Sequence, residues 1–358
     1  MHLTTDVLQL VTSNDRRGAE TFAVALAAEL ERRRRSVATM ALVPGSSRQL
    51  LPVPALGKRR LGIGTLRALR SRSRQSRVLI AHGSSTLPAS VIATLGTGVP
   101  LVYRSIGDPR YWSRSNRTRL QTAALLRRAQ LVVALSEGAA RDLVTRVDVP
   151  EHKVTVIPNG VSARRFPAVD ERSRAVARRR LDVSDRTSIA VFLGALSPEK
   201  DVGTAISAVA KLPDVHLLVA GDGPERHALE DLAARVAPGR VKFVGATDDA
   251  AQTLAAADVV VLSSRTEGLP GVLIEAGMSA IPSVTTDVGL VREIIVDGET
   301  GFVVARDRPE LFADAIERAV ANAPTLGGAA RERCLARFEI AVVADAWERA
   351  LDRVLAHG

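Results

Sequence analysis

The sequence predicts an α/β protein with two domains, each built on a doubly wound parallel β-sheet with helices on both faces. Short apolar runs rich in β-branched residues alternate with amphipathic helical stretches through most of the 358 residues. The runs are apolar on both faces, which is typical of strands buried between two helical layers. The alternation stops once near residue 160 and then starts again. Because the chain is also too long for a single hydrophobic core, we expect two domains.

Strands and helices follow one another in order along the first half of the chain. The expected strands are 7–11, 37–41, 78–81, 101–103, 131–134 and 154–157, and the helical stretches include 19–35, 85–95 and 114–128. Turn residues without a periodic pattern then run from Pro158 to Asp170, where we place the domain linker.

The second half of the chain repeats this alternation. Its expected strands are 189–193, 216–220, 241–244, 259–262, 283–285 and 302–304. The last segment is helical, because five apolar residues fall on one helical face: Ile340, Val343, Trp347, Leu351 and Val354. We expect domains at 1–166 and 167–338, with a C-terminal helix at 339–358 that packs back onto the first domain. Ligands of such folds bind at the carboxyl ends of the strands, here in a central cleft that the two domains face.

Composition excludes several classes of function. Aromatic residues make up only 3% of the chain, which disfavours a stacking surface for single-stranded nucleic acid, and no nucleic-acid recognition motif is present. The single cysteine, Cys334, cannot form an internal disulfide, and no Cys/His cluster has zinc spacing. No apolar run of 18 residues and no leader pattern occurs. We therefore expect a cytoplasmic protein with no nucleic-acid partner and no bound metal.

The charge of the chain is unevenly distributed. The net charge is +10, but residues 1–166 hold 27 Lys and Arg against 10 Asp and Glu, and the remainder is acidic. A basic half indicates contact with something anionic. The basic stretch 58–77 has Leu61, Ile63, Leu66 and Leu69 interleaved, so it either lies on the inner membrane surface as a peripheral contact or forms a solvated helix.

The most informative motif runs from Ser264 to Ala276. It follows an expected strand and opens a helix at Pro270, whose missing N–H suits a first helical turn. Glycines beside Pro270 let a ligand approach the backbone, and the exposed N–H groups of a helix start favour an anion. Glu267 and Glu275 frame this turn, and their carboxylates accept hydrogen bonds from hydroxyl groups. A ligand with phosphates between hydroxyl-bearing rings, such as a nucleotide sugar, fits both features.

Two further glycine turns follow strands of the second half. Gly194 to Gly203 contains Lys200, placed where a point charge reaches a phosphate. Gly221 and Gly223 form the second turn, which is a weak motif that also suits a tight turn alone.

Together these residues resemble the retaining glycosyltransferases of family 4 (glycosyl transferases group 1), which have the GT-B fold of two Rossmann-like domains. The family pattern of two glutamates separated by seven residues matches Glu267 and Glu275. The resemblance covers nearly the whole chain. It also includes the segments 18–20, 158–161, 243–245 and 289–301.

The resemblance implies a role for each matching residue. Glu275 is expected to bind the donor ribose, Glu267 the donor sugar, and Lys200 the diphosphate. The first domain is expected to hold the acceptor and the second the nucleotide sugar. The other residues expected beside the donor are Gly18, Gly194, Gly221, Arg265, Leu269, Pro270, Gly271 and Val272.

Four positions depart from the family pattern. The usual arginine is Ala195, so one phosphate cation is missing, and Arg265 or Arg292 is our candidate to replace it. Arg17 stands where a glycine precedes Gly18, and Ser162 replaces an aspartate after the linker.

The fourth departure concerns a catalytic side chain. Arg104 to Asp108 stands where the family histidine follows a strand. Asp108 and His82, which ends an earlier strand, are candidates for a catalytic role, and a structural role for His82 stays open.

The function that this implies is a hexosyl-type glycosyltransferase. It would move a sugar from a nucleotide-diphosphate donor to an unknown glycan, lipid or small-molecule acceptor, with retention of configuration and without a metal. Two alternatives stay open: a GT-B nucleotide-sugar 2-epimerase, and a catalytically weak sugar-nucleotide-binding relative. A nicotinamide dehydrogenase is disfavoured, because residues 12–18 lack the G-x-G-x-x-G pattern.

Overall fold

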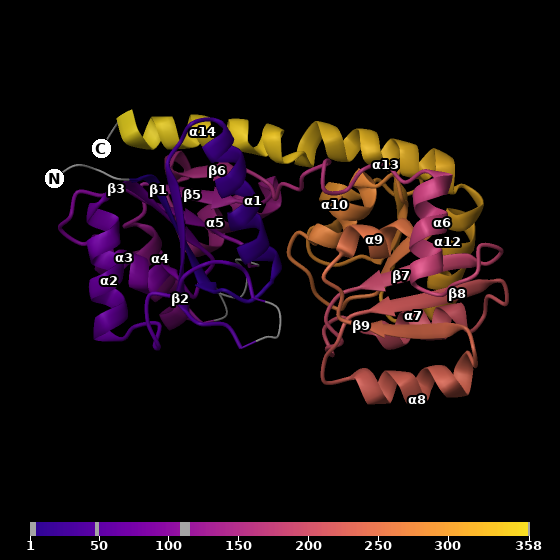
Figure 1. Cartoon of the computed structure of the whole chain (residues 1–358). Helices are drawn as coiled ribbons and strands as arrows, with labels where there is room; N and C mark the ends of the chain where they lie inside the picture. The colour runs from indigo at the N-terminus through magenta and orange to yellow at the C-terminus, as the bar shows by residue number, and fades with distance from the viewer. Residues whose placement is uncertain (1–4, 47–49, 108–114, 357–358) are drawn as a thin grey trace. The chain divides into compact units, whose positions relative to one another are not determined.

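The computed structural model describes residues 5–46, 50–107 and 115–356. The chain divides into two compact units: an N-terminal unit of Met1–Gly160 with Ile340–Gly358, and a C-terminal unit of Val161–Glu339. Each unit contains one six-stranded sheet between helices (Figure 1). The predicted class of two doubly wound parallel-sheet α/β domains is confirmed. The cleft between them stays a prediction.

The sheet of the N-terminal unit has the strand order β2-β1-β3-β4-β5-β6, and every neighbouring pair is parallel. Its strands are β1 (Thr5–Ser13), β2 (Val37–Val43), β3 (Ser76–His82), β4 (Leu101–Arg104), β5 (Leu131–Ala134) and β6 (Val154–Val156). Its helices are α1 (Gly18–Arg32), α2 (Ile63–Arg74), α3 (Leu87–Thr94), α4 (Asn116–Leu126), α5 (Glu137–Val147), the 3-10 turn η2 (Glu151–Lys153) and α14 (Ile340–Ala356).

This sheet is buried on both faces, as the apolar strands predict. Neighbouring residues of a strand point to opposite faces. Val7 packs with Phe22 and Leu26 of α1, in the same core cluster as α14. Leu8 packs instead with Leu69 of α2, in a cluster that α3, α4 and α5 also line. The helices therefore form one layer on each face.

The last helix, α14, completes the core of the N-terminal unit. Its Trp347 is fully buried against the sheet and α1. Two arginines after α1 fix the outer side of α14. Arg33 bonds to the carboxylates of Asp345 and Glu348, and Arg35 donates to Asp352 at 2.5 Å. The side of α14 that is predicted to be apolar is thus the side that closes the core.

The sheet of the C-terminal unit has the strand order β12-β11-β10-β7-β8-β9, again parallel throughout. Its strands are β7 (Ser188–Leu193), β8 (Val215–Ala220), β9 (Val241–Gly245), β10 (Val259–Leu262), β11 (Ser283–Thr286) and β12 (Gly301–Val304). Its helices are α6 (Glu171–Arg180), α7 (Val202–Val209), α8 (Arg226–Val236), α9 (Ala250–Ala255), α10 (Gly271–Met278), α11 (Val291–Ile294), α12 (Pro309–Ala321) and α13 (Ala323–Phe338).

The chain passes between the units at Gly160–Val161 and again at Glu339–Ile340, so the first change of unit precedes the predicted boundary at 166. Val161 forms a bridge with Glu339 and donates its N–H to Phe338 O at 2.8 Å. These bonds attach residues 161–166 to the C-terminal unit, although their turn-rich sequence resembles a free linker. Within the N-terminal unit, a Cβ added to Gly160 would lie 2.7 Å from Ile340 Cδ1.

We predict that Trp347→Ala destabilises the N-terminal unit by about 3–5 kcal/mol, because it leaves a cavity in a closely packed core. Urea denaturation followed by circular dichroism measures the change. The control is Val342→Ala on the same helix, which removes a side chain that is 42% exposed and should cost less than about 0.5 kcal/mol. Equal effects of the two substitutions would contradict the prediction.

Candidate functional site

The residues predicted to bind the donor lie in loops that follow parallel strands of the C-terminal unit. Gly194 and Lys200 follow β7, Gly221 follows β8, and the segment from Ser264 to Pro270 follows β10. Because the strands are parallel, these loops share the carboxyl edge of one sheet, where ligands of such folds bind.

At this edge the structure brings together Lys200 and Glu267, which are far apart in sequence. Lys200 Nζ donates to Glu267 Oε1 at 2.6 Å, and Ser264 Oγ donates to the same oxygen at 2.6 Å. The side chains of Lys200 and Glu267 are only 22% and 9% exposed, respectively. Among the described residues, Glu267 Oε2 has no hydrogen-bond partner, so it can accept from a ligand hydroxyl. The sequence singled out both residues but did not predict their ion pair.

The backbone of Glu267 is fixed by a glycine after β11. Gly289 has φ +56°, and a Cβ at this position would lie 2.0 Å from Glu267 O. Leu290 N–H donates to Gly268 O at 3.0 Å, and Thr286 Oγ1 donates to Ser264 O at 2.5 Å. Only glycine allows this close approach. Gly289 belongs to a matched segment of the family pattern, but its contact with Glu267 could not be read from the sequence.

Helix α10 begins beside this loop, with Pro270 as its N-cap residue and Gly271 as its first residue. The predicted start at Pro270 is therefore early by one residue. No side chain caps the helix, and no heavy atom lies within 4 Å of a Cβ added to Gly271, as far as the described residues show. The space beside the Gly271 Cα is therefore open, and the first N–H groups of a helix, here at Gly271 and Val272, have no partner within the helix and suit an anion.

Glu275 lies one turn inside α10 and is partly buried. Burial raises the pKa of its carboxyl to about 6, and the nearby Arg165 charge partly opposes this shift. A carboxylate with so few solvent contacts gains from a hydroxyl donor, which is the partner that a ribose supplies.

The turns at Gly194 and Gly221 pack directly against each other. A Cβ added to Gly221 would lie 1.8 Å from Gly194 O, and one added to Gly223 would lie 2.3 Å from Leu196 O. Gly194 N–H also donates to Ala220 O at 3.0 Å. The close packing of the two turns explains why glycines stand at these positions. Their contact with a donor stays a prediction.

Neither candidate replacement for the arginine missing at Ala195 carries a free charge. Arg265 lies 3.3 Å from Asp201 Oδ2 and 3.8 Å from Asp307 Oδ1. Arg292 donates to both carboxylate oxygens of Asp287, at 3.0 and 2.9 Å, and this pairing raises its pKa. Either arginine must leave or share its carboxylate to meet a phosphate, so the replacement stays a prediction.

In the N-terminal unit, Gly18 is the first residue of α1, after the extended Arg17. No heavy atom of the described residues lies within 4 Å of a Cβ added there. Space for a ligand therefore exists at this helix start, as the close-approach role requires. Asp108 lies outside the described residues.

His82 ends β3 and is 1% exposed. Its Nδ1 lies 3.3 Å from Arg104 Nη1, and its Nε2 lies 2.8 Å from Gln9 Oε1. Burial, followed by the Arg104 charge, lowers the pKa of His82 well below its usual value. The ring is therefore neutral at physiological pH and both nitrogens are occupied. Proton transfer by His82 stays a prediction that these contacts disfavour.

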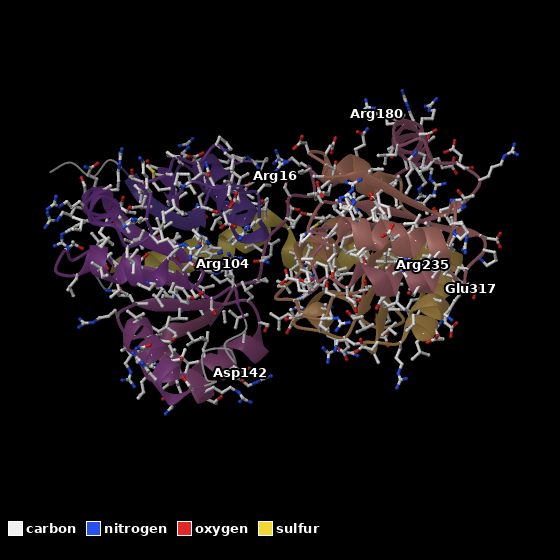
Figure 2. All side chains as sticks on the ribbon, turned by 90° about the horizontal axis from the view of Figure 1, so that it is seen from below. Arg16, Arg104, Asp142, Arg180, Arg235 and Glu317 are labelled. Carbon is white, nitrogen blue, oxygen red and sulfur yellow. The ribbon has the colours of Figure 1, made fainter. Side chains whose placement is uncertain are left out.

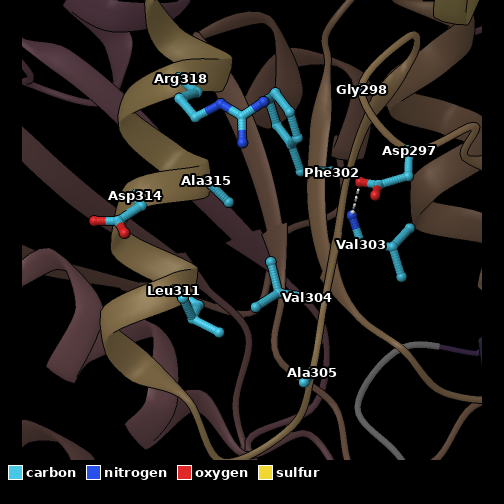
Figure 3. Close-up of a pocket in the computed structure, with 10 residues that line it drawn as sticks. All are labelled: Asp297, Gly298, Phe302, Val303, Val304, Ala305, Leu311, Asp314, Ala315 and Arg318. Atoms are coloured by element: carbon cyan, nitrogen blue, oxygen red, sulfur yellow. Dashed lines mark hydrogen bonds between the residues drawn. The ribbon is translucent and has the colours of Figure 1, made fainter.

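Two hollows of the C-terminal unit are lined by other residues. One, of about 690 Å³, is bounded by the 164–173 segment and α9. The other, of about 310 Å³, lies between β12 and α12, where the Arg318 guanidinium stacks 4.3 Å from the Phe302 ring (Figure 3). None of the residues predicted to bind the donor lines either hollow.

Residues 5–46, 50–107 and 115–356 contain neither a cluster of metal-binding side chains nor a membrane-spanning helix. In these ranges no group of three or more His, Cys, Asp or Glu side chains could hold a metal ion. No helix there has the length and apolar composition needed to cross a membrane.

Solved structures with the same fold are GT-B glycosyltransferases. HepE of Anabaena, in a structure titled as a complex with UDP-glucose, matches 98% of this chain and 100% of its own with a TM-score of 0.86 and 22% identity. WaaG, described as a glycosyltransferase of lipopolysaccharide biosynthesis, matches 97% of this chain and 99% of its own with a TM-score of 0.73 and 17% identity. The architecture is thus that of a GT-B glycosyltransferase.

Family models match both units. Residues 16–165 match the model described as Glycosyltransferase Family 4, and residues 187–322 match Glycosyl transferases group 1. The chain belongs to this family of glycosyltransferases.

Two curated relatives show how far the similarity extends. The lipopolysaccharide core biosynthesis glycosyltransferase LpsE of Rhizobium meliloti is 37% identical over 48% of this chain and 49% of its own. The alpha-D-kanosaminyltransferase of Streptomyces kanamyceticus is 32% identical over 62% of this chain and 61% of its own. The match thus spans less than two thirds of either relative.

We predict that Glu275→Gln stabilises the fold at alkaline pH. The folded-state pKa of about 6 lies above the ordinary value of 4.5, so the folded protein binds this proton more tightly than the unfolded chain. The resulting stability is present below pH 4.5 and is lost as the pH rises through 6. Between pH 4 and pH 8, the free energy of unfolding of the variant should gain on the order of 1–2 kcal/mol over the wild type.

Urea denaturation at both pH values measures this gain. Glu317→Gln, at an exposed carboxylate of α12 (Figure 2), is the matched control for the loss of one charge. A difference between Glu275→Gln and wild type that does not change with pH would refute the prediction.

Proposed function

We propose that the chain is a hexosyl-type glycosyltransferase that moves a sugar from a nucleotide-diphosphate donor to an acceptor hydroxyl, with retention and without a metal. One observation carries the proposal. The Lys200–Glu267 pair at 2.6 Å joins the loop before α7 to the loop before the uncapped start of α10, with Glu275 one turn inside α10. A cation, free backbone donors and two carboxylates suit a ligand with both phosphates and hydroxyls.

The chemistry follows from the charge that develops during transfer. Breaking the anomeric bond leaves negative charge on the departing nucleotide diphosphate. Lys200 Nζ and the N–H groups of Gly271 and Val272 are the donors we assign to this charge. Each such fixed donor is typically worth about 3 kcal/mol in the transition state. Ala195 offers no such donor, so an additional cation would be required for the full effect.

The two carboxylates have separate tasks in this proposal. Glu267 Oε2 accepts hydrogen bonds from hydroxyls of the donor sugar, while its Oε1 keeps Lys200 in place. Glu275 accepts from the ribose hydroxyls. With retention, the leaving phosphate assists deprotonation of the acceptor on the same face of the sugar, and no protein nucleophile is required. The name of the kanosaminyltransferase supports transfer of a sugar, and the UDP-glucose in the HepE structure supports a sugar nucleotide as the donor class.

Two other functions would use the same donor site. A 2-epimerase would release a sugar that still carries its nucleotide, and a non-catalytic relative would bind the donor without turning it over. Product analysis by nuclear magnetic resonance separates all three, because only transfer yields free nucleotide diphosphate together with a glycosylated acceptor, whose anomeric coupling reports retention or inversion.

We propose that the N-terminal unit makes a peripheral contact with an anionic membrane. In this proposal the protein is cytoplasmic, and its acceptor is a glycan, a lipid or a small molecule. In the 58–77 segment Leu69 is buried, whereas Leu61 and Ile63 are 54% and 70% exposed. Arg67 and Arg74 follow Ile63 by four and eleven residues, which places all three on one helical face. Exposed apolar and basic side chains on one face favour an anionic surface.

We predict that one of UDP, GDP, ADP or dTDP raises the melting temperature of the protein. At about 100 times its dissociation constant a ligand stabilises the fold by roughly 2.7 kcal/mol. Glu275→Ala should show a much smaller shift from its own unliganded baseline, because the ribose loses its acceptor. Thermal-shift titration measures both, with Glu317→Ala as the control. If none of the four nucleotides shifts the wild type, the proposed donor class is wrong.

We predict that the protein pellets at low salt with vesicles of equimolar phosphatidylcholine and phosphatidylglycerol. Arg67→Glu combined with Arg74→Glu should weaken this association by at least about tenfold, since each basic residue contributes about 1 kcal/mol. The matched control is Arg179→Glu with Arg180→Glu, which reverses the same number of charges at exposed positions of α6. Absence of wild-type pelleting, or equal loss in both variants, would exclude this surface.

A further inference from the structure

Arg104 is a fully buried arginine at the end of β4 in the N-terminal unit (Figure 2). Burial lowers the pKa of its guanidinium to about 9, and the charge of Glu20 in α1 partly opposes this shift. Among the described residues no carboxylate forms an ion pair with it. Removing a cation from water without such a pair is costly. The contacts that hold this side chain therefore require an explanation beyond packing.

Three groups surround the guanidinium. Its central carbon lies 3.9 Å from the centre of the Phe22 ring, a cation–π contact with α1. Nη1 lies 3.3 Å from His82 Nδ1, and Nη2 donates to Asn159 Oδ1. The neighbours thus come from α1, from β3 and from the segment after β6.

These bonds continue as a chain through the unit. Arginine only donates, so His82 Nδ1 accepts and the ring proton lies on Nε2. Nε2 then donates to Gln9 Oε1 at 2.8 Å, and Gln9 Nε2 donates to Ala23 O at 2.9 Å. One arrangement of protons satisfies every link. We call this series of groups, Ala23 O, Gln9, His82, Arg104 and Asn159, the Arg104 chain.

The two ends of the Arg104 chain lie at functionally informative places. One end is in α1, five residues after Gly18 and the open first turn of that helix. The other end is Asn159, which precedes Gly160, the last residue before the chain passes into the C-terminal unit. A series of buried and partly buried hydrogen bonds thus joins the second turn of α1, next to its open first turn, to the crossover segment.

We propose that Arg104 is a positioning residue for sugar transfer, which holds the first turn of α1 and the crossover segment at Asn159–Gly160 in a fixed relation through the Arg104 chain. This inference rests on the proposed function and on the expectation that Gly18, in the first turn of α1, lies beside the donor. Arg104 itself is 0% exposed, so it acts through its partners and does not touch the substrate.

Energetics favour positioning over stability as the reason for this arginine. Buried charged groups are often replaced by apolar residues of similar size with no loss of stability. The hydrogen-bond chain instead specifies one arrangement of its members, although Arg104 Nε is buried without a hydrogen-bond partner among the described residues. The same chain gives His82 a role that needs no proton transfer, because its neutral ring links Arg104 to Gln9.

Hydrogen exchange measured by mass spectrometry on the full chain tests the coupling. Arg104→Met should raise exchange by about tenfold in peptides that cover 18–23 and 157–160, and Arg104→Lys should restore part of the protection. Gln9→Leu breaks the chain at the opposite end from Asn159, and we expect it to raise exchange at 157–160 as well. Ser73→Ala, at a buried hydroxyl bonded to Leu69 O, is the control and should change neither segment.

Two exchange results would overturn the Arg104 chain. One is unchanged exchange at 157–160 in Gln9→Leu, since the ends would then be independent. The other is a uniform rise across the N-terminal unit in Arg104→Met, which a merely structural residue would give. Peptides from 188–262 of the C-terminal unit serve as the internal reference.

Donor turnover tests the link to catalysis. Arg104→Met should lower kcat by at least about tenfold, while the KM for the donor and the Kd for the nucleotide stay within about twofold. Unchanged kcat overturns the positioning role, even where exchange supports the chain. A wild-type protein that binds no nucleotide and turns over no donor overturns the proposed function and the catalytic role of Arg104 together. The hydrogen-exchange result then decides only whether the Arg104 chain couples its two ends.

Discussion

Parallel strand pairing is the constraint on which both units depend. Each strand must be followed by a crossover that returns the chain to the same end of the sheet, so the loops after the strands collect at one edge. In the C-terminal unit this edge joins the loops after β7, β10 and β11. The Lys200–Glu267 bond and the contact of Gly289 with Glu267 both follow from that geometry. The site is therefore built from loops that the sheet, and not sequence proximity, brings together.

The sequence predicted the strands well, because a strand buried on both faces leaves a continuous apolar run. Every expected run falls within a strand of the structure except 154–157, which extends one residue beyond β6, and α1, α3 and α4 lie where helical periodicity placed them. Contacts between distant loops could not be predicted in this way. No local sequence pattern indicates that Gly289 lies against the backbone of Glu267, or that Gly221 packs against Gly194. The sequence of residues 161–166 also did not indicate that they belong to the C-terminal unit, because the bridge from Val161 to Glu339 is a long-range contact.

The departures from the family pattern have different structural meanings. In the C-terminal unit, Ala195 removes a cation, and the two candidate replacements, Arg265 and Arg292, are paired with Asp201 and Asp287. In the N-terminal unit, Arg104 adds a cation that the protein surrounds with Phe22, His82 and Asn159. Residue identity alone cannot distinguish these cases. The carboxylates near each arginine decide whether its charge is neutralised, available to a ligand or used inside the fold.

The return of α14 to the N-terminal unit has a consequence for synthesis. The core of that unit includes Trp347, which a ribosome adds after all residues of the C-terminal unit, Val161–Glu339. Domains usually fold in the order in which they emerge. Here the domain that begins first is completed last, because one face of its sheet carries α1 but lacks α14 until the second domain has been made. Chaperones that bind exposed apolar surface would therefore meet the N-terminal half of the nascent chain for longer than the C-terminal half.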